Sequence, residues 1–484
     1  MKPLNIVGRR AEIQSLNRAL RSKKAEMIAL YGRRRVGKTY LVRSFFKTQA
    51  AYLEIVGLKD GTLHQQLEIF TQALSEHFYS GIALQNPKNW QDALTLLDKE
   101  IKNLKKPLVI FLDELPWLAT PKSHLLEQLD HFWNAKWSTN SHVKLILCGS
   151  AASWMIDNIV DAKGGLHNRL TDRLAIQPFT LKETEEYLKF QSIKLGRKQI
   201  LELYMCLGGI PYYLNALKKG ESTAQAINRI CFQKNGLLFE EFERLYSSLF
   251  NNSNDYIQIV RALAKARQGV SRNQLLKTLK LPSGGRFAKK LKELEEAGFI
   301  SSFVPFGKTA KDVTYRLVDE FSTFHISWIE SAPKGIFSSK GTDYWKKIQS
   351  SQSFRSWCGF TFEGICLKHY KSLMTALDLD GLGVTPGSWR YVSKNPKEKG
   401  VQIDLLFDRS DGIITLCELK YYNDSFIISK DYAGDLEKKQ QTFKNVMKIK
   451  KEVFLCLVTP SVATQNVHYG RCVDNEINLD GLFN

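Results

Sequence analysis

At 484 residues, with 43% hydrophobic and 24% charged side chains, the chain has the composition of a globular protein that is too long for one hydrophobic core. Its apolar runs stay below the roughly 18 residues of a membrane span and its start has no secretory apolar core, so we expect a cytoplasmic protein without membrane contact. The net charge of +20 favours a polyanionic partner such as nucleic acid, although a basic proteome would produce the same excess.

The 8 cysteines are scattered along the chain without a C-x-x-C pair. Several lie inside apolar, strand-like runs, as Cys148 and Cys456 do. Cysteines in this setting are expected to be buried, reduced thiols and not zinc ligands.

The first motif with a chemical meaning is G-x-x-x-x-G-K-[ST] at residues 32–39. The apolar run 27–30 predicts a buried strand that enters this loop, and residues 39–46 predict the helix that leaves it. In this setting backbone N–H groups hold phosphates, the lysine reaches the β- and γ-phosphates, and the threonine hydroxyl binds Mg²⁺. We therefore expect ATP to contact the whole loop, which consists of Gly32, Arg33, Arg34, Arg35, Val36, Gly37, Lys38 and Thr39.

A second hydrophobic strand is predicted at residues 107–112, and it ends in Asp113 and Glu114. Behind a phosphate loop this is the Walker B arrangement, in which Asp113 holds the Mg²⁺ shell and Glu114 polarises the attacking water. A third strand, residues 143–148, leads to Ser150, which either senses the γ-phosphate or caps the next helix.

Arg169 follows the third strand and is a candidate to stabilise charge on the γ-phosphate. It would act in its own chain or on a neighbouring subunit of a homo-oligomer. The alternative is that Arg169 lies on a solvated face, as most arginines do.

These motifs occur in the order Gly8-Arg9-Arg10-Ala11-Glu12, phosphate loop, Leu112-Asp113-Glu114, Cys148-Gly149-Ser150 and Leu207-Gly208-Gly209-Ile210-Pro211-Tyr212-Tyr213-Leu214. The series, over residues 1 to about 235, resembles the AAA+-like/STAND ATPases of the archaeal ATPase family. The resemblance implies a RecA/AAA+-like parallel sheet and ATP hydrolysis, with Gly8 and Arg9 beside the base and ribose. It also implies a small helical lid that contains Pro211, which spacing alone would assign to an ordinary turn between helices. The family usually has Gly-Arg where this chain has Asn168-Arg169.

The middle of the chain is predicted to be a winged helix-turn-helix. Helices are expected from Tyr256, from Ser271 and over 286–297, and strands over 299–304 and 313–318. Residues 272–292 carry seven Lys or Arg side chains and no acid, which suits contact with DNA phosphates. A role in packing between domains is the alternative.

The C-terminal region is expected to begin after the Ser/Gly/Lys-rich stretch 337–341. A helix holds Glu363, and strands 401–407 and 413–420 form a predicted hairpin with Asp404 on the first strand and Glu418 and Lys420 on the second. Alternation along the second strand points Glu418 and Lys420 to one face. Carboxylates placed in this way can bind Mg²⁺ or Mn²⁺, and a lysine beside them can stabilise developing charge.

The set Glu363, Asp404, Glu418 and Lys420 resembles the PD-(D/E)XK nuclease superfamily and the C-terminal domain often fused to these archaeal-type ATPases. The resemblance implies a restriction-endonuclease-like α/β fold and metal-dependent cleavage of nucleic acid, with Asp404 and Glu418 as metal ligands. A degenerate domain that binds without cutting is the alternative. The lysines that precede the hairpin would either contact phosphates or be solvated; they are Lys394, Lys397 and Lys399.

Together the patterns predict an α/β protein with four domains. They are a P-loop ATPase core (1–180), a helical lid (181–235), a winged helix-turn-helix (236–335) and a PD-(D/E)XK nuclease-like domain (336–484). Two functions fit this organisation. The first is an ATP-driven or ATP-gated nuclease that binds DNA; the second is an ATP-dependent switch or DNA-binding regulator whose nuclease-like domain is inactive.

Overall fold

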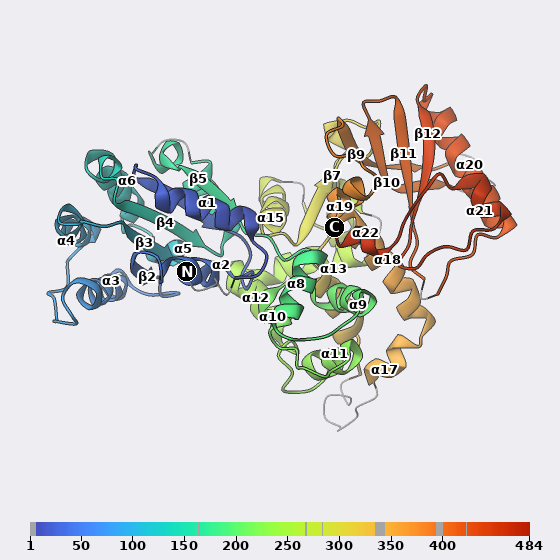
Figure 1. Ribbon diagram of the computed structural model, residues 1–484. Helices are drawn as coiled ribbons and strands as arrows, with labels where there is room; N and C mark the ends of the chain where they lie inside the picture. The colour runs from blue at the N-terminus through green and yellow to red at the C-terminus, as the bar shows by residue number, and fades with distance from the viewer. Residues whose placement is uncertain are drawn as a thin grey trace. The chain divides into compact units, whose positions relative to one another are not determined.

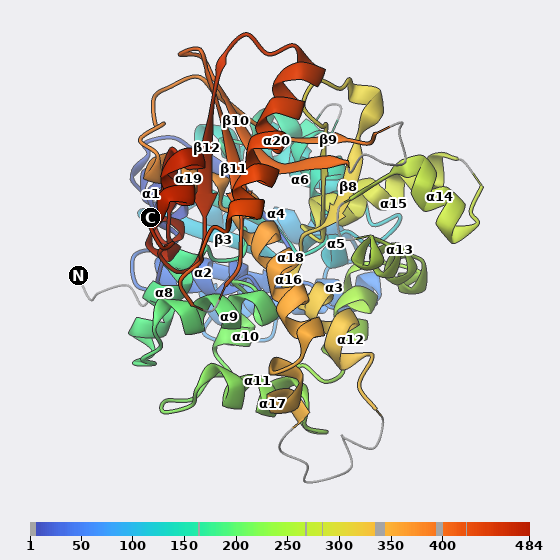
Figure 2. The same cartoon turned by 90° about the vertical axis from the view of Figure 1, so that its right-hand side faces the viewer.

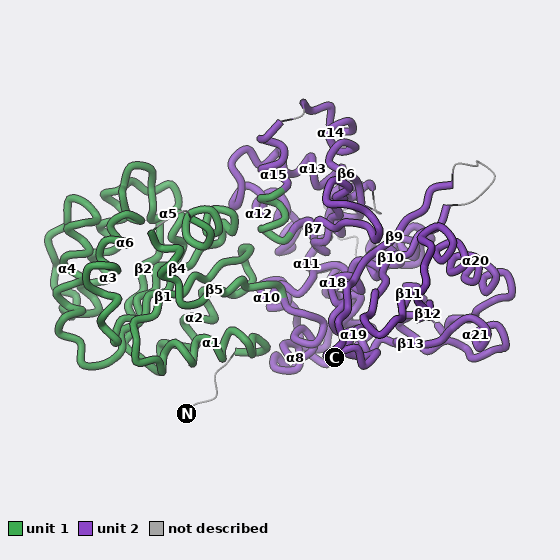
Figure 3. Tube along the Cα trace, turned by 90° about the horizontal axis from the view of Figure 1, so that it is seen from above, with its two compact units in different colours: residues 1–178, 292–298 green, residues 179–291, 299–484 purple. Residues whose placement is uncertain are grey.

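The computed structural model describes residues 6–162, 165–266, 269–282, 284–333, 344–393, 400–422 and 424–484. The chain divides into two compact units, which Figure 3 shows in different colours. Unit 1 comprises residues 1–178 and 292–298, and unit 2 comprises residues 179–291 and 299–484. The linker expected at 337–341, the domain boundary at 336 and the lysines Lys394, Lys397 and Lys399 lie outside the described residues.

Unit 1 is built on a parallel five-stranded sheet in the order β2-β3-β4-β1-β5 (Figure 1). Strands β3 and β4 are buried along their whole length, which explains why both are continuous apolar runs in the sequence. The strands predicted at 27–30, 107–112 and 143–148 are confirmed as β1, β3 and β4. The strands are β1 (Glu26–Tyr31), β2 (Ala51–Val56), β3 (Leu108–Asp113), β4 (Val143–Gly149) and β5 (Asp172–Ala175).

Helices surround this sheet, and buried Leu, Ile, Phe and Trp side chains fill the space between the layers. Because β4 lies between β1 and β3, the carboxyl ends of three neighbouring strands open at one edge of the sheet, where parallel sheets bind ligands. The helices are α1 (Arg10–Arg21), α2 (Lys38–Phe46), α3 (Leu63–Phe78), α4 (Trp90–Lys102), α5 (Leu115–Leu118), α6 (Leu125–Ala135) and α7 (Ala152–Met155), with short turns η1 (Trp137–Thr139), η2 (Ile156–Val160) and η3 (Gly165–Arg169).

The first part of unit 2 is helical and ends in a small antiparallel sheet, and the helix Gly285–Glu296 belongs to unit 1 from Lys292 onward. The helices and strands predicted between 256 and 318 are present, and a short strand, β6, adds to the expected pair because it lies beside β8 in the order β6-β8-β7. The elements are α8 (Leu181–Phe190), α9 (Arg197–Leu207), α10 (Pro211–Leu214), α11 (Thr223–Cys231), α12 (Glu241–Leu249), α13 (Ser253–Lys265), β6 (Val270–Ser271), α14 (Arg272–Leu279), α15 (Gly285–Glu296), β7 (Ile300–Phe303), η4 (Ala310–Asp312), β8 (Thr314–Leu317), α16 (Glu320–Phe324) and η5 (His325–Ile329).

The second part of unit 2 holds a mixed five-stranded sheet in the order β13-β12-β11-β10-β9. Strands β9, β10 and β11 pair antiparallel, while β12 and β13 join parallel to β11 after the crossover helix α20. Helix α18 lies beside α16 (Figure 2). Between the two helices, the ring centroids of Trp357 and Phe324 lie 5.8 Å apart. The elements are α17 (Tyr344–Gln349), α18 (Gln352–Lys368), α19 (Tyr370–Ala376), β9 (Val384–Tyr391), β10 (Val401–Arg409), β11 (Ile413–Leu419), α20 (Lys430–Met447), β12 (Glu452–Val458), α21 (Val467–Cys472), β13 (Asn475–Ile477) and α22 (Leu479–Leu482).

Two expectations from composition can be compared with this fold. Every cysteine is a buried free thiol, as the scattered pattern predicted. Within the described residues, no helix is long and apolar enough to cross a membrane.

Candidate functional site

The phosphate loop lies between β1 and α2, as its strand–loop–helix setting predicted. Gly32 has φ 142°, and a Cβ there would collide with the backbone carbonyl of Ile176, so only glycine fits this position. Lys38 is buried, and its Nζ donates hydrogen bonds to the carbonyls of Gly32 at 2.8 Å and Arg33 at 3.0 Å. The ammonium group is therefore held over the loop, where phosphate oxygens could take the place of the carbonyls.

The two predicted Mg²⁺-shell residues meet directly, although they are far apart in the sequence. The Thr39 Oγ1 donates a hydrogen bond to Asp113 Oδ2 at 2.6 Å, and the Glu114 N–H donates to the other carboxylate oxygen at 3.0 Å. A hydroxyl and a carboxylate at the end of a phosphate loop are hard oxygen ligands of the kind that Mg²⁺ prefers. The donor set of Thr39 and Asp113 therefore fits this cation.

Glu114 and Ser150 come from neighbouring strand ends and contact one another. The Ser150 Oγ donates to Glu114 Oε2 at 2.8 Å, and the Ser150 N–H donates to the same oxygen at 3.1 Å. The residue that caps α7 is Ala151, without a side-chain hydrogen bond, so Ser150 does not serve as the helix cap. The serine instead orients the carboxylate that is the candidate to polarise water.

The remaining N-terminal candidates have different surroundings. Arg9 is buried, and its Nη2 donates to the carbonyl of Val36 at 3.0 Å, so the Gly8-Arg9 pair lies beside the phosphate loop. Arg33 is buried, Arg34 is half-buried, and half-buried Arg35 has a left-handed backbone with φ 74°.

Arg169 is exposed at the end of η3. Pro211 belongs to unit 2, where it occupies the first turn of α10.

The C-terminal candidates lie in unit 2 on α18, β10 and β11, except that Lys420 is the residue directly after β11. The antiparallel register places Leu405 opposite Cys417, so the next residues along the two strands are Asp404 and Glu418. The Nζ of Lys420 lies 3.3 Å from Glu418 Oε1. The pairing of the strands thus brings together the three strand residues that the sequence predicted as one site.

Glu418 is buried among cationic and hydroxyl groups. Lys439 Nζ donates to its Oε2 at 2.5 Å, and the Tyr432 hydroxyl donates to its Oε1 at 2.6 Å. Burial raises the pKa of Glu418, but the charges of Lys439 and Lys420 outweigh burial and hold this pKa below its usual range. The carboxylate is therefore ionised at neutral pH.

The pKa of Glu363 is shifted in the direction opposite to that of Glu418. Burial, and next the nearby charge of Asp404, raise the pKa of Glu363 to about 8, although Arg316 and Lys420 act against this rise. Both side chains are half-buried, and two carboxylates that repel one another in such surroundings are common in catalytic and cation-binding sites. Asp404 is half-buried and accepts a hydrogen bond from Gln402 Nε2 at 2.5 Å.

Sequence reasoning did not find Tyr432, Lys439 or Arg316. Tyr432 and Lys439 lie seven positions apart on α20, so they share a helix face, and this spacing after the Glu-x-Lys strand was the available signal. Arg316 lies on β8, and nothing in the local sequence separates it from the other basic residues of the chain.

The carboxylates of this second site fit a divalent cation in their chemistry. Across the described ranges, no three His, Cys, Asp or Glu side chains are placed together as a ready-made metal cluster. Asp404 and Glu418 supply hard oxygen donors, and a cation between them would relieve the repulsion that Asp404 exerts on Glu363. To bind it, Glu418 would exchange one of its lysine contacts for the cation.

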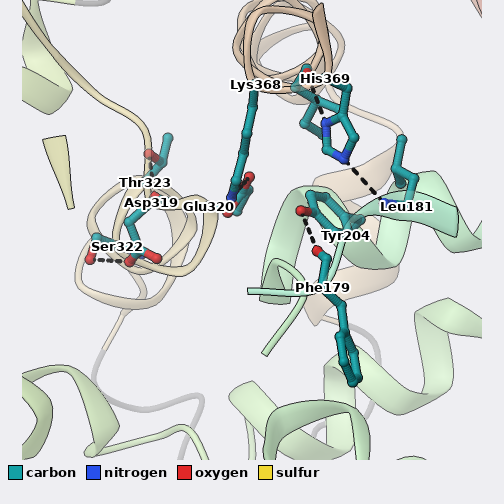
Figure 4. Close-up of polar contacts among 10 residues, drawn as sticks. Phe179, Leu181, Tyr204, Asp319, Glu320, Ser322, Thr323, Lys368 and His369 are labelled. Atoms are coloured by element: carbon teal, nitrogen blue, oxygen red, sulfur yellow. Dashed lines mark hydrogen bonds and ion pairs between the residues drawn. The ribbon is translucent and has the colours of Figure 1, made fainter. Parts of the chain in front are cut away.

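A buried polar network fixes the C-terminal end of α18 to the helices α8 and α9, as Figure 4 shows. His369 Nε2 accepts a hydrogen bond from the Leu181 N–H at 3.1 Å, and its Nδ1 lies 2.9 Å from the carbonyl of Ile365. The Tyr204 hydroxyl donates to the carbonyl of Phe179 at 2.8 Å. His369 can satisfy both partners only as the neutral Nδ1–H tautomer.

The Gly-Gly-x-Pro element belongs to the same region. A Cβ on Gly209 would collide with the backbone of Phe179, whose N–H donates to the Gly209 carbonyl at 2.7 Å. Gly208 has φ 62° and lies against the carboxylate of Glu320, which is buried and forms an ion pair at 2.8 Å with Lys368. Gly208 therefore permits the close approach of Glu320 on α16, and Gly209 permits the close approach of the Phe179 backbone, which precedes α8.

We expect this network to weaken in mild acid. Burial lowers the pKa of His369 to about 4 from 6.5, so between these values the unfolded chain binds the additional proton and stability falls as the pH falls. The loss between about pH 7 and pH 5 should be roughly 2 kcal/mol for this group. Urea unfolding at both pH values measures it. His369→Gln keeps an acceptor for the Leu181 N–H and should flatten the dependence; an unchanged dependence would contradict the assignment.

A second buried histidine, His325, is the reason to compare the wild type with His369→Gln, and not only the wild type at two pH values. It stacks on Phe242 with ring centroids 4.4 Å apart, and burial lowers its pKa to about 3. The pKa of His325 is shifted downward like that of His369, so His325 also makes the protein less stable in acid. It does so in the wild type and in the variant alike. The difference between the two proteins isolates His369.

The parallel sheet, the phosphate loop and the Thr39–Asp113 and Glu114–Ser150 pairs define a P-loop nucleotide-binding domain. Residues 6–217 match a family described as an ATPase domain predominantly from Archaea. This part of the chain is therefore an archaeal-type ATPase domain, and the match supports ATP binding and ATPase activity.

Individual proteins are similar to this chain over stretches that differ from the 6–217 match. An uncharacterized protein of Methanocaldococcus jannaschii is 25% identical over 413 residues, which cover 83% of each chain. An uncharacterized ATP-binding protein of the same organism is 46% identical over 43 residues, 9% of this chain and 73% of that one. Among solved structures, the Walker-type ATPase of Pyrococcus abyssi is similar with a TM-score of 0.48 and 21% identity, over 66% of this chain and 96% of that chain.

Proposed function

We propose that this protein is an ATP-hydrolysing AAA+/STAND-type machine whose C-terminal centre cleaves phosphodiester bonds of nucleic acid with Mg²⁺ or Mn²⁺. The observation that carries the proposal is the set of charged side chains around Glu418. One buried, ionised carboxylate has Lys420 and Lys439 beside it, and Asp404 lies next along the paired strand and acts on Glu363. A domain that only docks to a partner has no chemical need for this combination.

In the ATPase domain, Lys38 would bind the β- and γ-phosphates, and Thr39 and Asp113 would hold Mg²⁺, which neutralises phosphate charge when bound. Glu114, oriented by Ser150 at 2.8 Å, would polarise the attacking water. Arg169 is exposed, and it would be available to a neighbouring subunit of a homo-oligomer.

In the C-terminal centre, Asp404 and Glu418 would hold a divalent cation, which supplies Lewis acidity and an activated water when bound. Lys420 would stabilise negative charge that develops on the phosphate, since its ammonium lies at the same carboxylate. Burial and the charge of Asp404 raise the pKa of Glu363 to about 8 in the protein without a cation. A bound cation would offset the contribution of Asp404, so Glu363 would depend on burial to keep the proton that it is a candidate to donate to the leaving oxygen.

The middle of the chain would bind DNA as a winged helix-turn-helix. Several of its predicted phosphate contacts are exposed, among them Lys277, Lys280 and Arg286. Lys290 instead forms an ion pair with Asp255 at 2.5 Å. The exposed set supports a role in binding phosphates, while Lys290 is part of the packing.

The domain organisation of this proposal keeps the four segments expected from the sequence. They are the ATPase core (1–180), the lid with Pro211 (181–235), the winged helix-turn-helix (236–335) and the PD-(D/E)XK nuclease-like domain (336–484). The nucleotide state of the first segment would control the activity of the last.

The test is an assay of the purified protein on single-stranded and duplex DNA and on RNA, with Mg²⁺, Mn²⁺ or EDTA, and with or without ATP. We expect cleavage that needs the cation and changes in rate when ATP is added. If no nucleic acid is cut under any of these conditions while ATP is hydrolysed, the protein is an ATP-dependent switch and the nuclease proposal fails.

A further inference from the structure

Unit 2 contains a cavity of about 370 Å³ whose walls come from α13, β8, the α16–η5 segment and α18. Its volume lies within the range of roughly 300–1,000 Å³ that is usual for small-molecule sites. The lining combines aromatic and aliphatic side chains with two cations, Lys265 and Arg316, and with hydroxyl groups such as that of Thr323. It also contains one acid, Glu320, whose charge is paired with Lys368. A cavity of this composition suits a ligand with a flat apolar part and an anionic part.

Arg316 supplies the anion-binding feature of the cavity. Its Nε is shielded from solvent and has no hydrogen-bond partner, and its guanidinium lies 5.9 Å from the centre of the Phe303 ring. An Nε–H donor that is shielded from solvent and has no acceptor is costly, because buried polar groups are normally hydrogen-bonded. An anion that entered the cavity would supply the missing acceptor. Lys265, which is exposed at the cavity rim, would add a second positive charge.

The aromatic wall of the cavity comes from α18. Trp357 and Phe360 lie three positions apart, so they occupy neighbouring places on one face of the helix. Phe360 is 37% exposed, which leaves part of its ring accessible. Trp357 is buried, and its Nε1 donor has no hydrogen-bond partner. Aromatic rings beside a cation are the arrangement on which nucleobases stack in single-strand-binding proteins.

The cavity adjoins the candidate catalytic centre. Thr361 and Gly364 line it, and Glu363 lies between them on the same helix. The charge of Arg316 acts on Glu363, so the guanidinium is close to both the cavity and the carboxylates. A ligand held at Arg316 would therefore lie next to the carboxylates of the candidate catalytic centre.

We infer that this cavity is a nucleotide subsite, with a phosphate bound by Arg316 and a base stacked against Phe360 and Trp357. The inference rests on the proposed function for its location, because it makes the ligand a nucleotide next to the cleaved bond. The same chemistry would come from one nucleotide of a single strand or from a free mononucleotide, and binding experiments separate the two sources.

The test measures binding of a short fluorescent oligonucleotide and of thymidine 5′-monophosphate, with a non-hydrolysable ATP analogue filling the phosphate loop and Ca²⁺ in place of Mg²⁺. Arg316→Gln and Phe360→Ala should each weaken oligonucleotide binding about tenfold. Arg316→Lys should retain most of the affinity, because it keeps the charge. Lys311→Gln, an exposed cation just before β8, is the matched control and should bind like wild type.

The outcomes separate this subsite from the proposed nuclease. Wild-type affinity in both Arg316→Gln and Phe360→Ala would overturn the subsite, whether or not the protein cuts nucleic acid. Weakened binding in both variants of a protein that never cuts would support the subsite and remove the nuclease. If the monophosphate binds as tightly as the oligonucleotide and both variants lose monophosphate binding, the natural ligand of the cavity is a free nucleotide.

Discussion

Replacement of Asp404 by alanine is expected to abolish metal-dependent cleavage of nucleic acid while ATP hydrolysis continues. Loss of a group that merely supports a metal ligand costs about 10- to 100-fold, so loss of a ligand should cost at least about 100-fold. The carboxylate is half-buried on β10, next to Glu418 along the paired strands. Initial rates of cleavage and of phosphate release, measured on one preparation, check both halves of the expectation.

The matched control is Asp408→Ala, four residues along the same strand. Asp408 pairs with Lys451 at 2.6 Å, so its loss removes an ion pair of β10 without touching the candidate centre. Cleavage should persist in this variant. Equal activity of Asp404→Ala and wild type would exclude Asp404 from the chemistry and leave the C-terminal region without its proposed role.

Lys38→Ala is expected to remove ATP binding. The Lys38 ammonium is buried and held by the Gly32 and Arg33 carbonyls at 2.8 and 3.0 Å, where it would meet the β- and γ-phosphates. Charge-assisted hydrogen bonds to phosphate are among the strongest polar contacts, so we expect a loss of at least about 100-fold in affinity. Titration with a fluorescent ATP analogue measures it.

Lys99→Ala is the control for this variant, because Lys99 is an exposed lysine on α4 of the same unit. It should bind ATP like wild type. If the ATPase domain controls the C-terminal centre, cleavage by Lys38→Ala should also stop responding to added ATP. An affinity close to that of wild type would contradict the role of Lys38 in phosphate binding.

The P-loop domain was predictable from the sequence because its chemistry is local. Eight consecutive residues, 32–39, provide the loop, and the apolar runs on each side predict the strand and helix that hold it. The Walker B strand follows the same logic, since a fully buried parallel strand is a continuous apolar run. The choice between two roles for Ser150 was not predictable, because only strand order decides that Glu114 lies beside it.

For the second site, the sequence predicted less and the tertiary structure decided more. Alternation along β11 predicted that Glu418 and Lys420 share a face, and their contact at 3.3 Å agrees. The raised pKa of Glu363 required the packing of α18 against the sheet, and the contacts of Lys439 and Tyr432 with Glu418 required α20. Arg316 comes from β8 of another predicted domain, so no local pattern indicated it.

The sequence by itself therefore determined the nucleotide site, the order of the elements and the identity of the candidate acids. These properties depend on neighbours along the chain, through hydrogen bonding of consecutive backbone groups and the periodicity of apolar residues. Only the tertiary structure decided the ionisation of Glu363 and Glu418 and the cavity beside Arg316. Burial and the distance between charges determine both, and folding brings these residues together from distant positions in the chain.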